Sequence, residues 1–332
     1  MTQSLVSIIL TVFDRVRYLE EAINSALGQT YPNLEVLVTD DADSEDVRKI
    51  VGKYSSDSRI RYRKNDAVLG APLNIRAAFN EIAGEYVVIL NDDDVMEPQM
   101  VETLLPPLSL DPNCAVSFGD HWIIDDAGEI SLRETEENTK RWGRDRISGG
   151  KIDNPLELAL RGGIPFVMGT VFRRTACSDS WLTREVEGAY DSWLALQLAL
   201  TNRTFYYNPT RVFRYRVHAA SESARVSAEK AKAQMFIFSE LLRDARADRE
   251  RSFIRKTLAH FHFVLGRDRL YFGNCCQARE AFLNSLRHAI SFRAAIGTLF
   301  TFIPISIQRW VLQSWRSLRG IRTDLPNSMA QK

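Results

Sequence analysis

Residues 6–12 have the sequence VSIILTV, and this apolar, β-branched run decides the fold. The next stretch carries Leu19 and Ile23 at helical spacing, and similar apolar runs return as LEVLVT at 34–39 and YVVIL at 86–90. Short β-branched runs that alternate with helical stretches are typical of βαβ units. We therefore predict an α/β fold whose parallel sheet is covered on both faces and whose strands end along one ligand-binding edge.

The composition is that of a folded, globular chain. Of the 332 residues, 45% are hydrophobic and 26% are charged, which excludes disordered, collagenous and polytopic membrane proteins. The net charge of +1 carries no basic excess, so we expect no nucleic-acid partner. Residues 251–332, however, hold 13 Lys or Arg against 3 Asp or Glu. The two parts of the chain are therefore expected to meet different partners.

Cysteine use and the N-terminal sequence both indicate a cytoplasmic protein. The cysteines show neither CxxC nor Cys/His spacing, which argues against a zinc site and against a disulfide framework. They are Cys114, Cys177, Cys275 and Cys276. The chain runs from Met1 into its first apolar run without the basic start and small-residue cleavage site of a secretory signal.

Acidic side chains follow two of the predicted strands. The run at 34–39 is followed by Asp40 and Asp41, and the run at 86–90 by Asn91, Asp92, Asp93 and Asp94. Helix N-caps and turns are the alternative explanation, because Asp is favoured at both. Three consecutive Asp residues at a strand end favour a cation or a hydrogen-bonding ligand instead, because clustered carboxylates repel one another.

A divalent ion is the ligand that best suits this acidic edge. Mg²⁺ or Mn²⁺ needs only one or two protein carboxylates when phosphate and water supply its other ligands, and it neutralises charge on a diphosphate leaving group. Asp93 is the first choice of ligand, assisted by Asp92 or Asp94. The sequence lacks the motifs G-x-x-x-x-G-K-[ST] and G-x-G-x-x-G, so neither a P-loop nor a dinucleotide fold is indicated.

The centre of the chain is less regular. Residues 134–151 are polar and charged and contain several glycines, which predicts a mobile loop that could close over the site. Helical spacing returns at 191–200. Residues 212–217 are predicted to form the last strand of a catalytic domain that spans residues 1–223.

Residues 224–332 are predicted to form a basic helical region. Within it, residues 294–307 are mostly apolar and flanked by arginines, but they fall short of a bilayer span and contain Pro304. Aromatic residues among arginines suit helices that lie in the headgroup region of an anionic membrane, and the basic charge favours this interpretation. The alternative is a core helix that packs on the catalytic domain or on another subunit.

Seven segments of the chain occur in the order of a known family's motifs. The segments are VSIILTVFDR (6–15), YLEEAINSALGQTYPNLE (18–35), VTDD (38–41), GEY (84–86), NDDD (91–94), YDSWLAL (190–196) and YRVHAASES (215–223). They closely resemble, in turn, the opening of glycosyltransferase family 2, its D-x-D region, the acidic segment with the catalytic base, and the closing Y-R-x-H-x-x-S-x-S motif. Several motifs in order are far more specific than any single one.

The resemblance implies a GT-A nucleotide-diphospho-sugar transferase fold with a C-terminal helical extension. It also implies an inverting enzyme that uses Mn²⁺ or Mg²⁺ and a nucleotide-diphospho-sugar donor, with a UDP-sugar as the default. The donor would be bound by Thr11, Phe13, Asp14, Asp41 and Asp92, and the metal by Asp93, Asp94 and His218. Asp191 would be the general base that takes the proton of the acceptor hydroxyl, because inversion is a single in-line displacement.

The assignment of the base stays open. Family members often carry a Glu-Asp pair where this chain has Gly188 and Ala189. Glu187 is therefore a rival base, and Asp191 has an alternative role as a helix N-cap.

The closing motif also leaves alternatives. His218 is a metal ligand, a diphosphate contact or a core histidine. Arg214 and Arg216 alternate along the same predicted strand, and either is a candidate to pair the phosphates.

The expected function is glycosyl transfer to a glycan or lipid-linked acceptor in cell-surface polysaccharide or glycan biosynthesis. We expect the protein to be peripheral on the cytosolic face of the membrane, bound to an anionic surface through its C-terminal region. One alternative is a nucleotidyltransferase, although residues 11–18 lack the glycine-rich basic loop that such enzymes use. Another is a catalytically silent GT-A binding module in a membrane assembly, against which the intact Asp41, Asp93 and Asp191 argue.

Overall fold

The computed structural model describes residues 3–13, 15–42, 44–218 and 228–303. Contacts divide the chain into two compact units, Met1–Arg251 and Ser252–Lys332. The predicted boundary after residue 223 falls outside the described ranges, so it stays a prediction.

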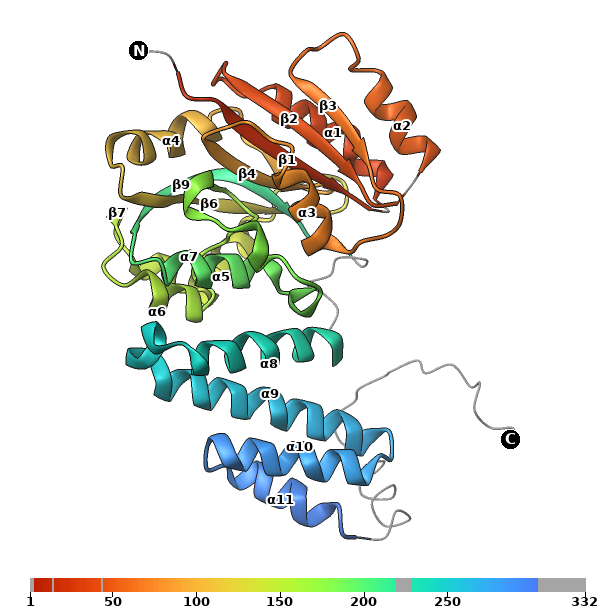
Figure 1. The fold of residues 1–332 in the computed structure, drawn as a ribbon, viewed down its shortest axis with the longest axis vertical. Helices are drawn as coiled ribbons and strands as arrows, with labels where there is room; N and C mark the ends of the chain where they lie inside the picture. The colour runs from red at the N-terminus through yellow and green to blue at the C-terminus, as the bar shows by residue number, and fades with distance from the viewer. Residues whose placement is uncertain (1–2, 14, 43, 219–227, 304–332) are drawn as a thin grey trace. The chain divides into compact units, whose positions relative to one another are not determined.

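The first unit is built on one mixed β-sheet (Figure 1). Its strands are β1 (Val6–Val12), β2 (Leu34–Asp40), β3 (Ile60–Lys64), β4 (Tyr86–Asn91), β5 (Val95–Met96), β6 (Cys114–Ile124), β7 (Gly150–Lys151), β8 (Thr170–Arg173) and β9 (Thr204–Arg216). Within the described residues their order is β3-β2-β1-β4-β8-β6-β9-β5, and β7 pairs with β9. The strands β3, β2, β1 and β4 are parallel neighbours, whereas β8 is antiparallel to β4 and β6.

The parallel strands end together, as the sequence predicts. Thr11 of β1 pairs in register with Thr39 of β2 and with Asn91 of β4. Every residue of β1 except Thr11 is buried, because helices cover both faces of such a strand. The acidic residues that follow β2 and β4 therefore reach one edge of the sheet, on either side of β1.

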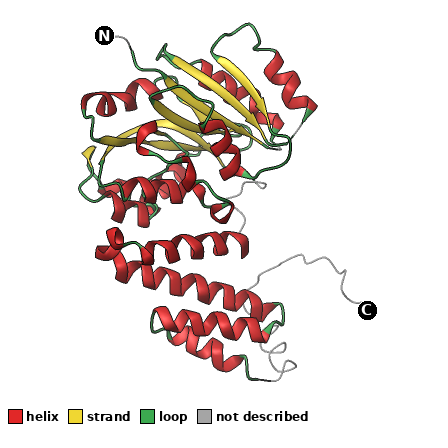
Figure 2. Cartoon of the chain, viewed as in Figure 1, coloured by secondary structure: helices red, strands yellow, loops and turns green. Residues whose placement is uncertain are grey.

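Helices flank the sheet (Figure 2). They are α1 (Val16–Leu27), α2 (Glu45–Gly52), α3 (Ala71–Phe79), α4 (Met100–Leu110), α5 (Leu132–Arg141), α6 (Pro155–Leu160), α7 (Tyr190–Ala199) and α8 (Ala228–Arg243). Leu19 and Ile23 lie on the buried face of α1, which confirms the helical spacing found in the sequence. The helix predicted at 191–200 is α7, and the strand predicted at 212–217 is the last part of β9.

The prediction of a loop over residues 134–151 is wrong in its first half, which forms most of α5. Ser131 caps this helix by accepting a hydrogen bond from a backbone N–H of its first turn. The buried face of α5 consists of Thr135 and Thr139, whose hydroxyls hydrogen-bond to β6. Because this inward face is polar, the sequence carries no apolar period that would reveal the helix.

The described part of the second unit is helical. Its helices are α9 (Arg251–Tyr271), which begins at the unit boundary, α10 (Cys275–His288) and α11 (Phe292–Phe300). Phe282 of α10 is buried between Gly266 of α9 and Gly297 of α11. A Cβ added to either glycine would lie 2.6 or 2.8 Å from its ring, so only glycine permits this packing. Among the described residues, each helix is too short or too polar to cross a membrane.

Candidate active site

The two acidic segments meet at the end of β1. On one side, the backbone N–H of Asp41 donates to the carbonyl oxygen of Val12 over 3.0 Å. On the other side, the backbone N–H of Phe13 donates to the Asp92 carboxylate over 3.1 Å. The edge of the sheet therefore brings the predicted nucleobase residue and the predicted metal segment to the same strand end.

Asp41 is held by the loop that precedes α3. Its carboxylate accepts hydrogen bonds from the Asn65 amide and from the backbone N–H groups of Leu69 and Gly70, each over 2.8 Å. Only 4% of Asp41 is exposed. Within the described residues Oδ2 accepts one of these bonds, which leaves it the capacity to accept another from a ligand N–H.

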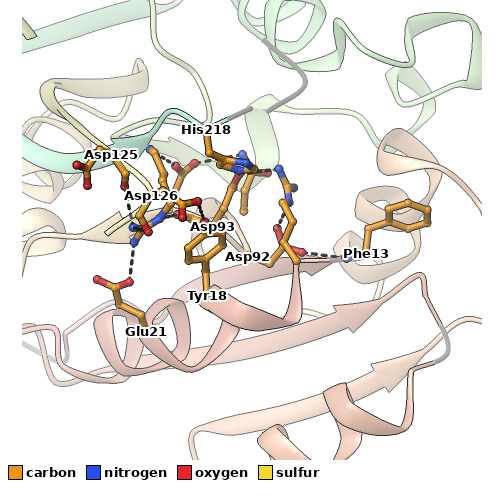
Figure 3. A network of polar contacts seen from close by, with 12 residues as sticks. Phe13, Tyr18, Glu21, Asp92, Asp93, Asp125, Asp126 and His218 are labelled. Carbon is orange, nitrogen blue, oxygen red and sulfur yellow. Dashed lines mark hydrogen bonds and ion pairs between the residues drawn. The ribbon is translucent and has the colours of Figure 1, made fainter. Parts of the chain in front are cut away.

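The other predicted donor residues occupy different positions along this edge. The Thr11 hydroxyl is partly buried and donates to Asn91 Oδ1 over 3.3 Å. Phe13 is 48% exposed, and its ring points away from the carboxylates (Figure 3). Asp14 lies outside the described residues. Thr11 and Phe13 therefore border the strand end, next to Asn91 and Asp92.

Asp93 faces His218, as the resemblance implies (Figure 3). His218 Nε2 lies 3.2 Å from Asp93 Oδ2, and both side chains are more than nine-tenths buried. The same Asp93 oxygen also contacts a positive side chain. The Arg15 guanidinium lies 2.6 Å from Asp93 Oδ2 and 2.7 Å from Asp92 Oδ1. Arg15 is the first basic residue after β1, but no pattern in the sequence indicates this role.

Asp94 is turned into the protein. Its Oδ1 accepts a hydrogen bond from the backbone N–H of Arg216 over 2.9 Å, and its Oδ2 accepts one from the Asn91 amide over 3.3 Å. Burial, reinforced by the neighbouring Asp93 charge, raises the pKa of the Asp94 carboxyl well above its usual range. These contacts suit a residue that positions β4 against β9.

Two of the predicted metal ligands lie together in the structure, and the third does not join them. Within the described parts of the chain, no three or more His, Cys, Asp or Glu side chains are grouped so as to hold a metal. The predicted trio of ligands is therefore not assembled. Asp93 and His218 do converge, and one carboxylate with one imidazole is a donor pair that fits Mn²⁺ or Mg²⁺ when phosphate and water complete the coordination.

Arg216 holds the metal segment in place through contacts that the sequence did not reveal. Its Nε donates to the backbone carbonyl of Asp93 over 2.8 Å, and its Nη1 donates to the carbonyl of Asp125 over 3.0 Å. Its Nη2 pairs with Glu21 at 2.6 Å, and the guanidinium lies 4.4 Å from the centre of the Tyr18 ring. Figure 3 shows these partners gathered around the Asp93 turn. Arg216 is thus a positioning residue.

These contacts give no support to phosphate binding by the arginines of β9. Arg216 is 1% exposed and fully engaged by the partners named above. Arg214 pairs with Glu97 at 2.7 Å. Both guanidinium groups therefore serve contacts within the protein.

The predicted base lies at the start of α7. Asp191 is partly buried in the first turn of this helix, and burial raises the pKa of its carboxyl. The preceding residue, Tyr190, donates a hydrogen bond to Asn91 Oδ1 over 3.3 Å. Burial, reinforced by the neighbouring negative charge of Asp191, raises the pKa of the Tyr190 phenol.

The rival base occupies another part of the site. Glu187 is exposed, and a Cβ built on Gly70 would lie 2.5 Å from its Oε1. Gly70 also donates to Asp41. Glu187 therefore lies beside the loop that holds the predicted nucleobase residue.

Comparison with known proteins independently supports the resemblance to glycosyltransferases. The family model described as Glycosyl transferase family 2 matches residues 7–178, just over half of the chain. An uncharacterized glycosyltransferase of Rickettsia conorii is 35% identical over 133 residues, which cover 39% of this chain and 21% of that protein. The UDP-Glc:alpha-D-GlcNAc-diphosphoundecaprenol beta-1,3-glucosyltransferase WfgD of Escherichia coli is 32% identical over 124 residues, 37% of this chain and 48% of that protein. The chain thus spans less than half the length of either relative.

Solved structures share the fold. TarS of S. aureus in complex with UDP-GlcNAc has a TM-score of 0.64 at 15% identity, over 97% of this chain and 94% of that chain. The mannosyltransferase PcManGT of Pyrobaculum calidifontis in complex with GDP-Man and Mn²⁺ has a TM-score of 0.56 at 17% identity, over 97% and 89%. The predicted GT-A fold with helices at the C-terminus is confirmed. Together with the matched family model, the fold shows that the chain belongs to glycosyltransferase family 2.

Proposed function

We propose that the protein is an inverting glycosyltransferase that moves a sugar from a nucleotide-diphosphate donor to an acceptor hydroxyl. The observation that supports this best is the buried pair of Asp93 and His218 at a sheet edge, tied through Tyr190 to the helix that carries Asp191. Inversion needs a stabilised leaving group on one side of the anomeric carbon and a base on the other. This edge offers candidates for both.

Asp93 and His218 would hold Mn²⁺ or Mg²⁺ at the donor diphosphate. When bound, the ion would neutralise the charge that develops on the leaving diphosphate. The hydrogen bond from Arg216 to the backbone of Asp93 fixes the turn that carries this carboxylate before any ligand arrives. The Mn²⁺ in the P. calidifontis mannosyltransferase supports the use of a divalent ion.

Asp191 would take the proton of the acceptor hydroxyl onto its carboxylate. Its raised pKa makes it a stronger base than an ordinary Asp, which favours proton transfer near neutral pH. The hydrogen bond from Tyr190 to Asn91 links this carboxylate to the strand that ends at the donor site. Acceptor activation and donor binding would therefore take place on adjoining elements.

We propose a UDP-sugar as the donor, with the Asp41 carboxylate accepting a hydrogen bond from the uracil ring. Two observations support uridine: the E. coli relative is named for UDP-Glc, and TarS was solved with UDP-GlcNAc. The free capacity of Asp41 Oδ2 suits the imide N–H of uracil.

UDP with Mn²⁺ is expected to raise the Tm of the protein by several degrees, and UDP with EDTA by clearly less. A ligand at a hundredfold excess over its Kd adds about 2.7 kcal/mol to the free energy of unfolding. Differential scanning fluorimetry with UDP, dTDP and GDP, each with Mn²⁺ or with EDTA, measures these shifts. A larger shift with GDP would reject uridine, and no shift with any nucleotide would reject the transferase proposal.

We also propose a lipid-linked glycan as the acceptor, at the membrane surface. The E. coli relative is named for an acceptor linked to diphosphoundecaprenol.

On α11 of this chain, Phe292, Ile296 and Leu299 recur at helical spacing and are 80%, 48% and 69% exposed. Residues 252–303 hold seven Lys or Arg against two Asp or Glu. An exposed apolar stripe within a basic unit suits an anionic membrane surface. The rest of the predicted membrane region, residues 304–332, lies outside the described residues.

The protein is expected to sediment with vesicles that contain anionic phospholipid, and substitution of Phe292→Ser with Leu299→Ser is expected to reduce the bound fraction several-fold. Each removed side chain loses apolar burial in the interface, and raising salt from 0.1 to 0.5 M should weaken binding further. Leu110→Ser is the matched control, because Leu110 is 83% exposed in the first unit. Equal binding of both variants and the wild type would refute a role for this stripe.

A further inference from the structure

Arg15 joins two buried carboxylates at the proposed metal site. Its guanidinium lies 2.7 Å from Asp92 and 2.6 Å from Asp93, whose side chains are 0% and 5% exposed. The Arg15 side chain itself is 25% exposed, so it approaches the pair from the open side of the edge. Without such a counter-charge, two adjacent buried carboxylates would strongly disfavour each other's ionised form.

The guanidinium and a metal ion compete for one atom. Arg15 Nη1 contacts Asp93 Oδ2, and this is the oxygen that lies 3.2 Å from His218 Nε2. Oδ2 is the Asp93 oxygen that faces His218, so a divalent ion held between the two side chains would lie close to the Arg15 guanidinium, and two positive groups repel each other at such distances. Binding of the ion would therefore favour release of Arg15 from Asp93.

The donor offers Arg15 another partner. Arg15 stands between β1 and α1, at the strand end where the diphosphate of the proposed donor would lie. The planar guanidinium fork pairs well with phosphate oxygens. We propose that Arg15 is an exchangeable counter-cation: it neutralises Asp92 and Asp93 in the donor-free protein and moves to the donor diphosphate when the metal binds. This inference rests on the proposed function and adds to it a residue that couples metal binding to nucleotide binding.

If Arg15 exchanges partners in this way, its removal should change the affinities for Mn²⁺ and for UDP in opposite directions. Loss of the guanidinium should tighten the binding of Mn²⁺ alone, because the ion no longer displaces a resident cation. It should weaken UDP binding at saturating Mn²⁺, because a charge-assisted contact to the diphosphate is lost. Coupling between two ligands usually amounts to about 5- to 150-fold, and by linkage it acts equally on both. A merely structural role would instead weaken both binding steps.

The test measures two dissociation constants by titration calorimetry: Mn²⁺ alone, and UDP at saturating Mn²⁺. For Arg15→Gln we expect Mn²⁺ to bind about tenfold tighter and UDP about tenfold weaker than in the wild type. Arg15→Lys keeps the positive charge but lacks the planar guanidinium group, so both of its dissociation constants should lie between those of the wild type and those of Arg15→Gln. Arg17→Gln is the matched control, since it removes the same charge two residues away, where Arg17 pairs with the exposed Asp126.

The outcomes separate this inference from the proposed function. If the wild type binds UDP with Mn²⁺ but both constants of Arg15→Gln and Arg15→Lys stay within twofold, the exchange is wrong and the proposed function stands. Weakening of both steps, or the same shifts in Arg17→Gln, would also overturn it. If the wild type binds no UDP with Mn²⁺, both proposals fail.

Discussion

The Asp191→Asn protein is expected to turn over about a hundredfold or more slowly than the wild type, with nearly unchanged donor affinity. Asn keeps the shape of the side chain but accepts no proton, and this carboxylate is proposed to act on the acceptor alone. Steady-state kinetics with a nucleotide sugar and an acceptor gives kcat, and UDP titration gives the donor affinity. A normal kcat for this variant would remove Asp191 from the role of base.

Glu187→Gln is the matched control for this experiment. Glu187 is exposed beside Gly70, so its substitution should change kcat by only a few-fold. If Glu187→Gln lost activity while Asp191→Asn stayed active, the role of base would pass to Glu187.

The pH profile of kcat/KM gives the same assignment a second readout. A general base works only when it is deprotonated, so activity should fall as the pH drops through the pKa of Asp191. Burial raises that pKa, so the acid limb should lie above about pH 4, where an ordinary Asp titrates. Glu187→Gln should leave this limb in place.

The Asp93→Asn protein is expected to lose more than about a hundredfold in kcat, together with the Mn²⁺ dependence of UDP binding. A metal ion supplies several kcal/mol of charge stabilisation in the transition state, and the amide is a far poorer ligand than the carboxylate. The lost charge also leaves Arg15 with only Asp92 as a partner in the acidic pair. Turnover assays and UDP titrations with and without Mn²⁺ measure both effects.

Asp46→Asn is the control for this loss of charge. Asp46 lies on α2 with a side chain that is 73% exposed, so its substitution should leave both measurements at wild-type values. Retention of Mn²⁺-dependent UDP binding by Asp93→Asn would show that the ion, if used, is held elsewhere.

The sheet edge is predictable from the sequence because its signals are local. The near-continuous apolar runs of β1, β2 and β4 can be buried only in a parallel sheet covered on both faces, and parallel strands bring their ends together. The positions of Asp41 and Asp93 at one edge follow from those runs alone. His218 follows the strand predicted at 212–217, and the resemblance to the family suggests its role beside Asp93.

The rest of the site depends on contacts between residues far apart in the chain. Arg216 and Asp93 are 123 residues apart, and Arg15 and Asp93 are 78 apart, so no periodicity reveals either pair. Asp94 has the same sequence environment as Asp93, yet the pairing of β5 with β9 turns it toward Arg216. The helix α5 was missed for a related reason, because it packs through threonines. Local sequence indicates which residues reach the edge, whereas tertiary pairing decides which of them stay accessible.

The glycine contacts around Phe282 limit which amino-acid substitutions the second unit can accept. In the described part of this unit, α9 and α11 each bring a glycine against the Phe282 ring of α10, so an extra methyl group at Gly266 or Gly297 must be matched by a smaller residue at 282. Sliding of one helix along another would carry a bulkier side chain into the ring. The helix that carries the apolar stripe is therefore held to its neighbour by a contact that tolerates little change in side-chain volume.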